Sequence, residues 1–147
     1  NRMVHLKPVE MDNYYDCLEL KRDDTKYVGN ALDVIAEAYI YRETSRAYAI
    51  YNDDTVIGLV IIDEERRNKP YRFTDLFIAD DYRNKGYGDK AVSAIIDHLI
   101  GKNVKTIQIQ VHNTNEVAIH IYQKYGFVFK ELASWDEGFW VMELELA

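Results

Sequence analysis

A glycine-containing charged turn is the sequence feature that most restricts how this chain can fold. Residues 80–88 are Asp-Asp-Tyr-Arg-Asn-Lys-Gly-Tyr-Gly, directly after an apolar, strand-like segment at 71–78 and directly before a helix-like segment at 89–100. A turn of this kind leaves backbone N–H groups free at the positive end of a helix dipole. It therefore predicts a strand-turn-helix unit that binds phosphate, with Arg83 and Lys85 adding positive charge.

The spacing of this turn excludes two common nucleotide-binding motifs. A dinucleotide fingerprint, G-x-G-x-x-G, needs a third glycine after Gly88, and none stands there. The P-loop pattern G-x-x-x-x-G-K-[ST] is absent as well. The alternative to a phosphate site is a helix that begins with two glycines after a polar loop.

A second motif follows at residues 113–127, Asn-Thr-Asn-Glu-Val-Ala-Ile-His-Ile-Tyr-Gln-Lys-Tyr-Gly-Phe. Asn115 is expected to cap a helix or to donate its amide to a ligand. Ala118 and Tyr122 are four residues apart and share one helix face, where the small Ala118 leaves room beside Tyr122. Gly126 is expected to end the helix. The alternative is that Tyr122 is only an aromatic residue of the core.

Hydrophobic periodicity predicts a single α/β (α+β) domain over residues 1–147, with helices on both faces of one mixed, mainly antiparallel sheet. The segment 107–111 alternates isoleucine or valine with glutamine, as in a strand with one wetter face. Asn52-Asp53-Asp54 indicates a hairpin turn. The expected strands are 3–8, 46–52, 55–63, 71–79, 104–112, 127–133 and 138–146, and the expected helices are 12–20, 27–41, 87–100 and 115–125.

Charge and cysteine content narrow the classes of function. The net charge of −7 lacks the basic excess of a nucleic-acid binder and favours the approach of a cationic substrate. Cys17 is the only cysteine, so no intrachain disulfide can form and a reducing, cytoplasmic location is expected. One cysteine and four scattered histidines provide no metal-binding pattern. No apolar run is long enough to span a membrane.

The two motifs together resemble those of the GNAT superfamily of acyl-CoA-dependent N-acetyltransferases. The turn matches R-x-x-G-x-G at 83–88, and the downstream segment matches N-x-x-A-x-x-x-Y-x-x-x-G-F at 115–127. The expected order of elements also matches, so that the resemblance covers nearly the whole chain. It implies a sheet whose strands four and five splay apart and hold the pantetheine arm of acetyl-CoA between them.

The resemblance also implies roles for particular residues. The backbone of strand four is expected to pair with pantetheine. The turn is expected to hold the pyrophosphate, and a Cβ on Gly86 would intrude there. An N–H of strand four, expected to be that of Phe77, is expected to donate a hydrogen bond to the oxyanion. Tyr122 protonates the leaving thiolate. The residues expected to bind acetyl-CoA are Leu76, Phe77, Ile78, Arg83, Asn84, Lys85, Gly86, Tyr87, Gly88, Asp89, Lys90, Asn115 and Tyr122.

The base that deprotonates the amine is not settled by the sequence. The pKa of an alkyl ammonium is about 10.4, so the amine must lose a proton before it attacks. Asp75 and Glu37 are candidates, and a water chain would also serve. Some polyamine acetyltransferases carry a glutamate one position before Asp75, where this chain has Thr74.

The acceptor is expected to be a polyamine. The segments 6–9, 34–39 and 73–78 look similar to bacterial spermine/spermidine N-acetyltransferases. Asp33, Glu37, Asp75 and Trp135 are expected to line the cleft by ion pairing and cation–π contact. A protein N-terminal acetyltransferase and a non-catalytic acyl-CoA sensor remain alternatives, and the sensor would not need Tyr122. An exposed edge strand would permit a homodimer.

Overall fold

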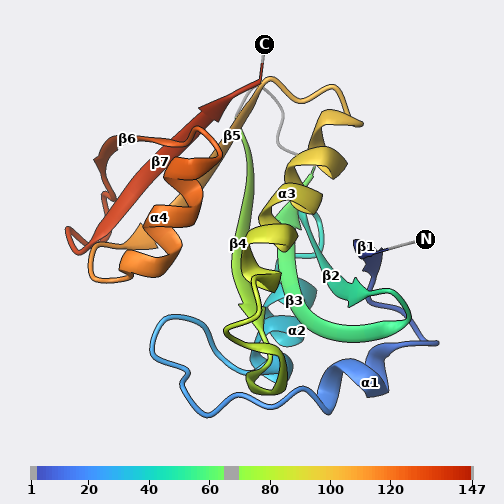
Figure 1. Ribbon diagram of the computed structural model, residues 1–147. Coiled ribbons are helices and arrows are strands. Elements are labelled where there is room, and N and C mark those ends of the chain that lie inside the picture. Colours follow the sequence, from blue (N-terminus) through green and yellow to red (C-terminus); the bar gives the residue numbers. More distant parts are fainter. Residues whose placement is uncertain (1–2, 65–69, 147) are drawn as a thin grey trace.

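The structure is a computed structural model that describes residues 3–64 and 70–146. Strands and helices alternate along the chain in nearly the expected order (Figure 1). The strands are β1 (Val4–Pro8), β2 (Ser45–Asn52), β3 (Thr55–Asp63), β4 (Tyr71–Ile78), β5 (Thr106–His112), β6 (Val128–Leu132) and β7 (Phe139–Glu145). The helices are α1 (Tyr14–Leu18), α2 (Ala31–Ile40), the 3-10 turn η1 (Asp80–Tyr82), α3 (Tyr87–Ile100) and α4 (Glu116–Lys124).

The strands form one seven-stranded sheet in the order β1-β2-β3-β4-β5-β7-β6. All neighbouring strands are antiparallel except β4 and β5, which run parallel. These two pair only where Tyr71 meets Ile107 and Arg72 meets Gln108, and they then separate (Figure 1). The expected fold class, including the splayed fourth and fifth strands, is confirmed.

Helices cover both faces of this sheet and bury a separate apolar cluster on each. In one cluster, residues of α3 and α4, such as Val92 and Ile119, pack on the sheet. The other takes residues of α1 and α2, such as Cys17 and Val34. In Figure 1, α3 and α4 stand in front of the sheet and α2 lies behind it. Strands β2, β3 and β4 supply residues to both clusters, because successive side chains of a strand point to opposite faces of the sheet.

The main differences from the expected elements concern α2, α1 and the turn before α3. The helix expected at 27–41 begins at Ala31, because the side chains of Asn30 and Asp33 form a capping box that starts it there. The helix expected at 12–20 is limited to Tyr14–Leu18. The turn before α3 contains the short 3-10 helix η1, which was not among the elements expected from the sequence.

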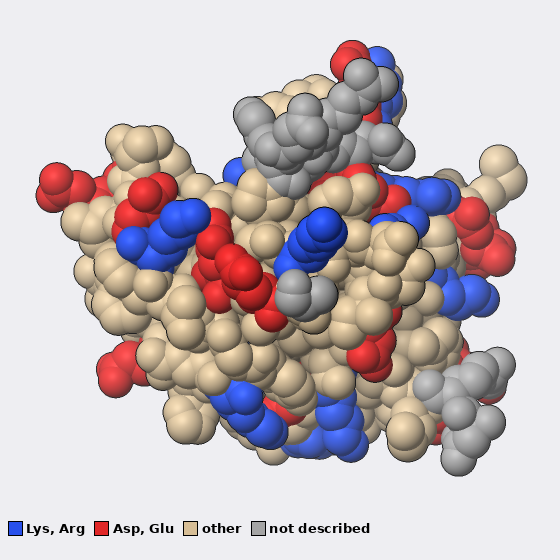
Figure 2. Space-filling view, turned by 90° about the horizontal axis from the view of Figure 1, so that it is seen from above, with Lys and Arg blue, Asp and Glu red and all other residues tan. Residues whose placement is uncertain are grey.

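The described residues also allow three observations, on surface charge, on membrane spans and on metal binding. Figure 2 shows Lys and Arg side chains interspersed with Asp and Glu over the face that it draws. Among the described residues, no helix combines the length and the apolar character that crossing a membrane requires. The same residues contain no group of three or more His, Cys, Asp or Glu side chains that could hold a metal ion.

Candidate active site

The turn before α3 presents an uncovered backbone. Asn84 and Gly86 have φ of 62° and 83°, in the left-handed region that favours glycine and tolerates asparagine. Gly86 is the N-cap of α3 and supplies no side chain to the first N–H groups of the helix. A Cβ on Gly86 would meet no protein atom within 4 Å, and one on Gly88 would meet only the Ile121 side chain at 3.9 Å. The backbone therefore borders open space that suits an anion.

The charged side chains around this turn have different surroundings. Arg83 and Lys85 are exposed, and no carboxylate of the described residues forms an ion pair with them. Lys90 lies 5.9 Å from the ring centre of Tyr87. Asp89 instead binds Lys124 Nζ at 2.6 Å and accepts a hydrogen bond from the Tyr125 hydroxyl, which joins α3 to α4. The Asp89 carboxylate thus has a structural role, and only its backbone remains available to a cofactor.

A β-bulge interrupts β4 next to the point where it leaves β5. Leu59 pairs with Phe77 and Ile61 pairs with Thr74, so that two β4 residues lie opposite Val60 alone. One of the two is Asp75, whose φ is 56°. A non-glycine residue in this region stores strain, which is common at functional sites.

Asp75 is a half-buried acid that lacks a complete set of partners. Its Oδ2 atom is buried, and no described residue forms a hydrogen bond with it. Burial, a hydrogen bond with Glu37 and the negative charges of Glu37 and Asp63 raise the pKa of Asp75 to about 7. A carboxyl group beside a negative charge keeps its proton to higher pH, because two neighbouring negative charges repel each other. Asp75 can therefore accept and release a proton near neutral pH.

The hydrogen bonding of β4 changes the expected oxyanion donor. Ala79 donates its N–H to Ile57 O on β3 at 2.8 Å, and the register stays unbroken back to Phe77. A Cβ on Gly58 of β3 would stand 2.1 Å from Phe77 O, so the Phe77 carbonyl also faces β3. Because N–H groups alternate between the two sides of a strand, the N–H of Phe77 faces β3 and that of Ile78 faces the open side.

Tyr122 lies where α4 packs on the sheet. Its ring centre is 6.0 Å from that of Phe73 and 5.6 Å from that of Phe127. Burial raises the pKa of its hydroxyl well above the ordinary tyrosine value. None of the hydrogen bonds among the described residues involves this hydroxyl. Tyr122 is therefore a residue of the core whose neutral hydroxyl has no hydrogen-bond partner in the described parts of the chain.

The remaining candidates for the amine site are only partly brought together. Glu37 on α2 meets Asp75, as described above. The side chain of Asp33 accepts from the N–H of Asn30 at 3.0 Å, which turns it to the start of its own helix. Trp135 is 62% exposed in the loop between β6 and β7, and its indole N–H donates to Gln110. Asn115 caps α4 through the N–H of Ala118, the first of its two expected roles.

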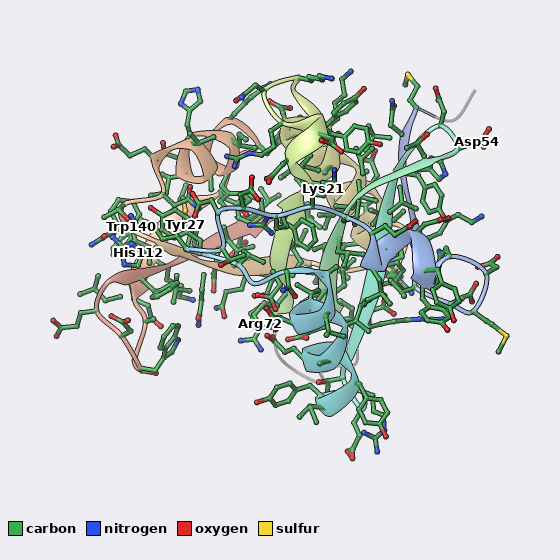
Figure 3. All side chains as sticks on the ribbon, turned by 90° about the horizontal axis from the view of Figure 1, so that it is seen from below. Lys21, Tyr27, Asp54, Arg72, His112 and Trp140 are labelled. Atoms are coloured by element: carbon green, nitrogen blue, oxygen red, sulfur yellow. The ribbon has the colours of Figure 1, made fainter. Side chains whose placement is uncertain are left out.

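Several residues near this site were not found from the sequence. Arg22 lies 4.3 Å from the ring centre of Phe77, and Tyr27 contacts the ring of His112 at 5.7 Å. Figure 3 shows Tyr27 beside His112. Because a helix was expected from residue 27, Tyr27 was assigned to that helix, and the loop before α2 was not recognised. The signal that could have found the loop is the capping box of Asn30 and Asp33, which ends it.

A solvent-open hollow of about 330 Å³ is lined by residues of α1 and the segment after it, the start of β3 and η1. Its lining includes the carboxylates of Asp16, Glu19, Asp54 and Asp81 and one lysine, Lys21. None of the expected site residues lines it.

Comparison with known proteins places this geometry in a family context. A model of the acetyltransferase (GNAT) family matches residues 12–127. Over 138 residues the chain is 27% identical to the spermine/spermidine N(1)-acetyltransferase of Bacillus subtilis (strain 168), which covers 86% of this chain and 88% of that one.

Solved structures resemble the chain in fold. The spermidine N-acetyltransferase from Vibrio cholerae, in complex with CoA and spermine, matches with a TM-score of 0.76 and 19% identity, over 99% of this chain and 96% of that one. The ribosomal-protein-S18-alanine N-acetyltransferase from Escherichia coli matches with a TM-score of 0.72 and 14% identity, over 97% and 94%. At these identities the two structures establish the likeness of fold alone.

Proposed function

The chain belongs to the acetyltransferase (GNAT) family, and from this premise we propose that it moves the acetyl group of acetyl-CoA to a primary amine of a polyamine such as spermidine or spermine. The family assigns the transferase activity. The polyamine is supported by the likeness to the Bacillus subtilis spermine/spermidine enzyme. The observation that carries the proposal is the carboxyl pair of Asp75 and Glu37 beside the bulge of β4, because it offers negative charge and a proton acceptor together.

The chain has a suitable surface for each part of acetyl-CoA. The uncovered N–H groups from Gly86 to Gly88, with Arg83 and Lys85, would hold the pyrophosphate. The open side of β4, where the N–H and C=O of Ile78 point, would pair with the pantetheine arm. Bound there, acetyl-CoA supplies an activated thioester. The N–H of Ile78 is then the backbone donor proposed for the oxyanion.

Asp75 is proposed as the base. A base works best when its pKa lies near the working pH, and the pKa of Asp75 is raised to about 7. A polyamine arrives as an ammonium, so Asp75 takes a proton from it directly or through water, and the nitrogen becomes a nucleophile. Glu37 adds a negative charge that attracts the ammonium and raises the pKa of Asp75.

Tyr122 is proposed to act on the leaving sulfur. The pKa of a thiol is about 8.5, whereas burial raises the pKa of Tyr122 above the ordinary tyrosine value of about 10. Loss of the proton from Tyr122 to the thiolate is therefore uphill. The hydroxyl is better suited to stabilise the thiolate by a hydrogen bond than to transfer its proton outright, so that the expected role of general acid becomes one of hydrogen-bond donor.

An acetyl-transfer screen tests the proposal. Acetyl-CoA would be supplied with spermine, spermidine, putrescine, aminoglycosides or peptides with free α-amines, and release of CoA would be followed. We expect spermine or spermidine to give the highest kcat/KM. Preference for a peptide would replace the polyamine by a protein α-amine. If the protein binds acetyl-CoA but transfers acetyl to none of these amines, it is a non-catalytic acyl-CoA sensor.

Other expectations stay predictions. A cytoplasmic location rests on the single Cys17, and a homodimer rests on the exposed edge of β6. We also predict that residues 1–147 form one domain.

A further inference from the structure

The loop between α1 and α2 touches both of the strands that separate. At the β4 end, Asp80 donates its N–H to Lys21 O at 2.9 Å, and Asp80 Oδ2 accepts from the N–H of Asp23 at 2.7 Å. At the β5 end, the Tyr27 hydroxyl is 2.8 Å from Thr114 Oγ1. Figure 3 shows this loop running from Lys21 to Tyr27. We call residues 21–29 the strap.

Arg22 organises the strap from inside. Its Nη1 donates to Gly29 O at 3.1 Å, and its Nη2 donates to Asp24 O at 2.9 Å and to Val28 O at 3.4 Å. One side chain thus joins the beginning of the strap to its end. A planar guanidinium can bind several carbonyls in one plane, whereas a lysine ammonium lacks this fork.

The same guanidinium fixes the strap to β4. It lies 4.3 Å from the ring centre of Phe77, a distance at which a cation is attracted to an aromatic face. Phe77 packs in the cluster formed with α1 and α2, and Asp75 meets Glu37 of α2. Arg22 therefore rests on the same face of β4 as the proposed base, two residues further along the strand.

We propose that Arg22 is a positioning residue for the amine site, which holds the strap across the separated ends of β4 and β5 beside Asp75 and Glu37. This inference rests on the proposed function, because it gives the strap the task of bordering the site that the amine enters. Arg22 is fixed to the side chain of Phe77, on the face of β4 that packs with α1 and α2, and not to the β4 backbone that is proposed to pair with pantetheine.

Kinetics of Arg22→Met and Arg22→Lys test the inference. We expect the KM for the amine to rise about tenfold in both, because one cation–π contact and several charged hydrogen bonds are lost or misplaced. The kcat at saturating amine and the Kd for acetyl-CoA should change less than about twofold, since Arg22 is not proposed to touch either reacting group. An equal loss of acetyl-CoA affinity would overturn the assignment to the amine site.

Arg42→Met is the matched control. Arg42 also lies 4.3 Å from an aromatic ring centre, that of Tyr39, and also donates to a backbone carbonyl, but it stands at the far end of α2. It should leave the KM for the amine unchanged. A rise equal to that of Arg22→Met would show a general effect of removing surface arginines and would contradict the proposal.

Hydrogen–deuterium exchange separates this inference from the proposed function, because it needs no turnover. Arg22→Met should speed the exchange of amides in the strap while leaving β2 and β3 protected. Tyr27→Phe, which removes only the hydroxyl at Thr114, should speed exchange at the end of the strap near Tyr27. Unchanged exchange in the strap of Arg22→Met would overturn the inference. Failure of the wild-type protein to acetylate any amine would instead remove the proposed function.

Discussion

At the scale of single residues, Asp75 combines features that are costly for stability. It has a positive φ in the middle of a strand, its Oδ2 is buried without a partner among the described residues, and a second carboxyl lies beside it. Each feature costs free energy, and together they produce a proton acceptor with a pKa near neutral. A residue that served only the fold would not need this combination.

Replacement of Asp75 by asparagine should remove the base and keep the backbone, because asparagine tolerates a positive φ. We expect kcat to fall about 100-fold or more. The wild-type kcat/KM should rise with pH through the region near pH 7, where Asp75 loses its proton, and this inflection should vanish in Asp75→Asn. Asp97→Asn, at an exposed position of α3, is the control. An inflection that persists in Asp75→Asn would assign the base elsewhere.

Glu37→Gln addresses the partner in the pair. Glu37 raises the pKa of Asp75, so its neutralisation should lower that pKa. The inflection in kcat/KM should therefore move to lower pH, and the KM for a polyamine should rise because one negative charge is lost. A pH–rate profile of the variant against wild type measures both effects. If the inflection stays in place, the two carboxyls are not coupled.

Tyr122→Phe tests the hydroxyl separately from the ring. The packing on Phe73 and Phe127 is kept, so we expect the folded state and the Kd for CoA to change little. The kcat should fall about 10- to 100-fold, as for loss of one hydrogen bond made in the transition state. Tyr39→Phe, at an exposed position of α2, is the control. Equal kcat values for Tyr122→Phe and wild type would reduce Tyr122 to a core aromatic.

At the scale of elements, the turn between β4 and α3 contains two glycines, Gly86 and Gly88, whose backbone conformations differ. Gly86 has a positive φ, whereas Gly88 lies within α3. A Cβ on Gly86 meets no protein atom within 4 Å, and one on Gly88 makes only an ordinary contact with the Ile121 side chain. Gly86→Ala should therefore lose roughly 1 kcal/mol of stability through backbone strain. Gly88→Ala should gain up to about 1 kcal/mol from helix propensity.

Both glycine variants should bind acetyl-CoA more weakly, because the added methyl group occupies the space beside the N–H groups proposed for the pyrophosphate. Thermal unfolding together with calorimetric titration separates stability from affinity. The decisive case is Gly88→Ala, in which the two effects have opposite signs. Normal acetyl-CoA affinity in that variant would exclude a pyrophosphate seated against Gly88.

At the scale of the whole molecule, Asp75 should make folding depend on pH. Its folded pKa of about 7 lies above the unfolded value of about 3.9, so the folded state binds more protons between these values. The contribution of Asp75 to stability is thus lost as pH rises from about 4 to about 7. Asp75→Asn removes this loss, and its stability relative to wild type should increase by on the order of a few kcal/mol between pH 5 and pH 8.

Urea unfolding of both proteins at pH 5 and pH 8 measures that difference. Asp89, whose pKa is lowered by its bonds with Lys124 and Tyr125, changes stability in the opposite direction as pH falls, but it contributes equally to both proteins. The comparison therefore isolates Asp75. A constant difference between the two proteins across this range would contradict a raised pKa at Asp75.

Local patterns along the chain were sufficient for the order of elements and the turn at 83–88, because periodicity, capping and glycine positions depend on neighbours in sequence. The separation of β4 from β5 was expected from the family resemblance instead. The motif at 115–127 likewise located α4, and Tyr122 on it, without any long-range information. The start of α2 was within reach of the same rules, since Asn30 and Asp33 have the spacing of a capping box.

Only the tertiary structure decided which of the expected site residues meet. The bulge in β4 and the packing of α2 bring Asp75 to Glu37, while the capping box takes Asp33 away from them. Arg22 reaches Phe77, and Tyr27 reaches Thr114, across long stretches of chain. Such contacts depend on strand register and on the angle at which helices pack, which residues adjacent in sequence do not determine.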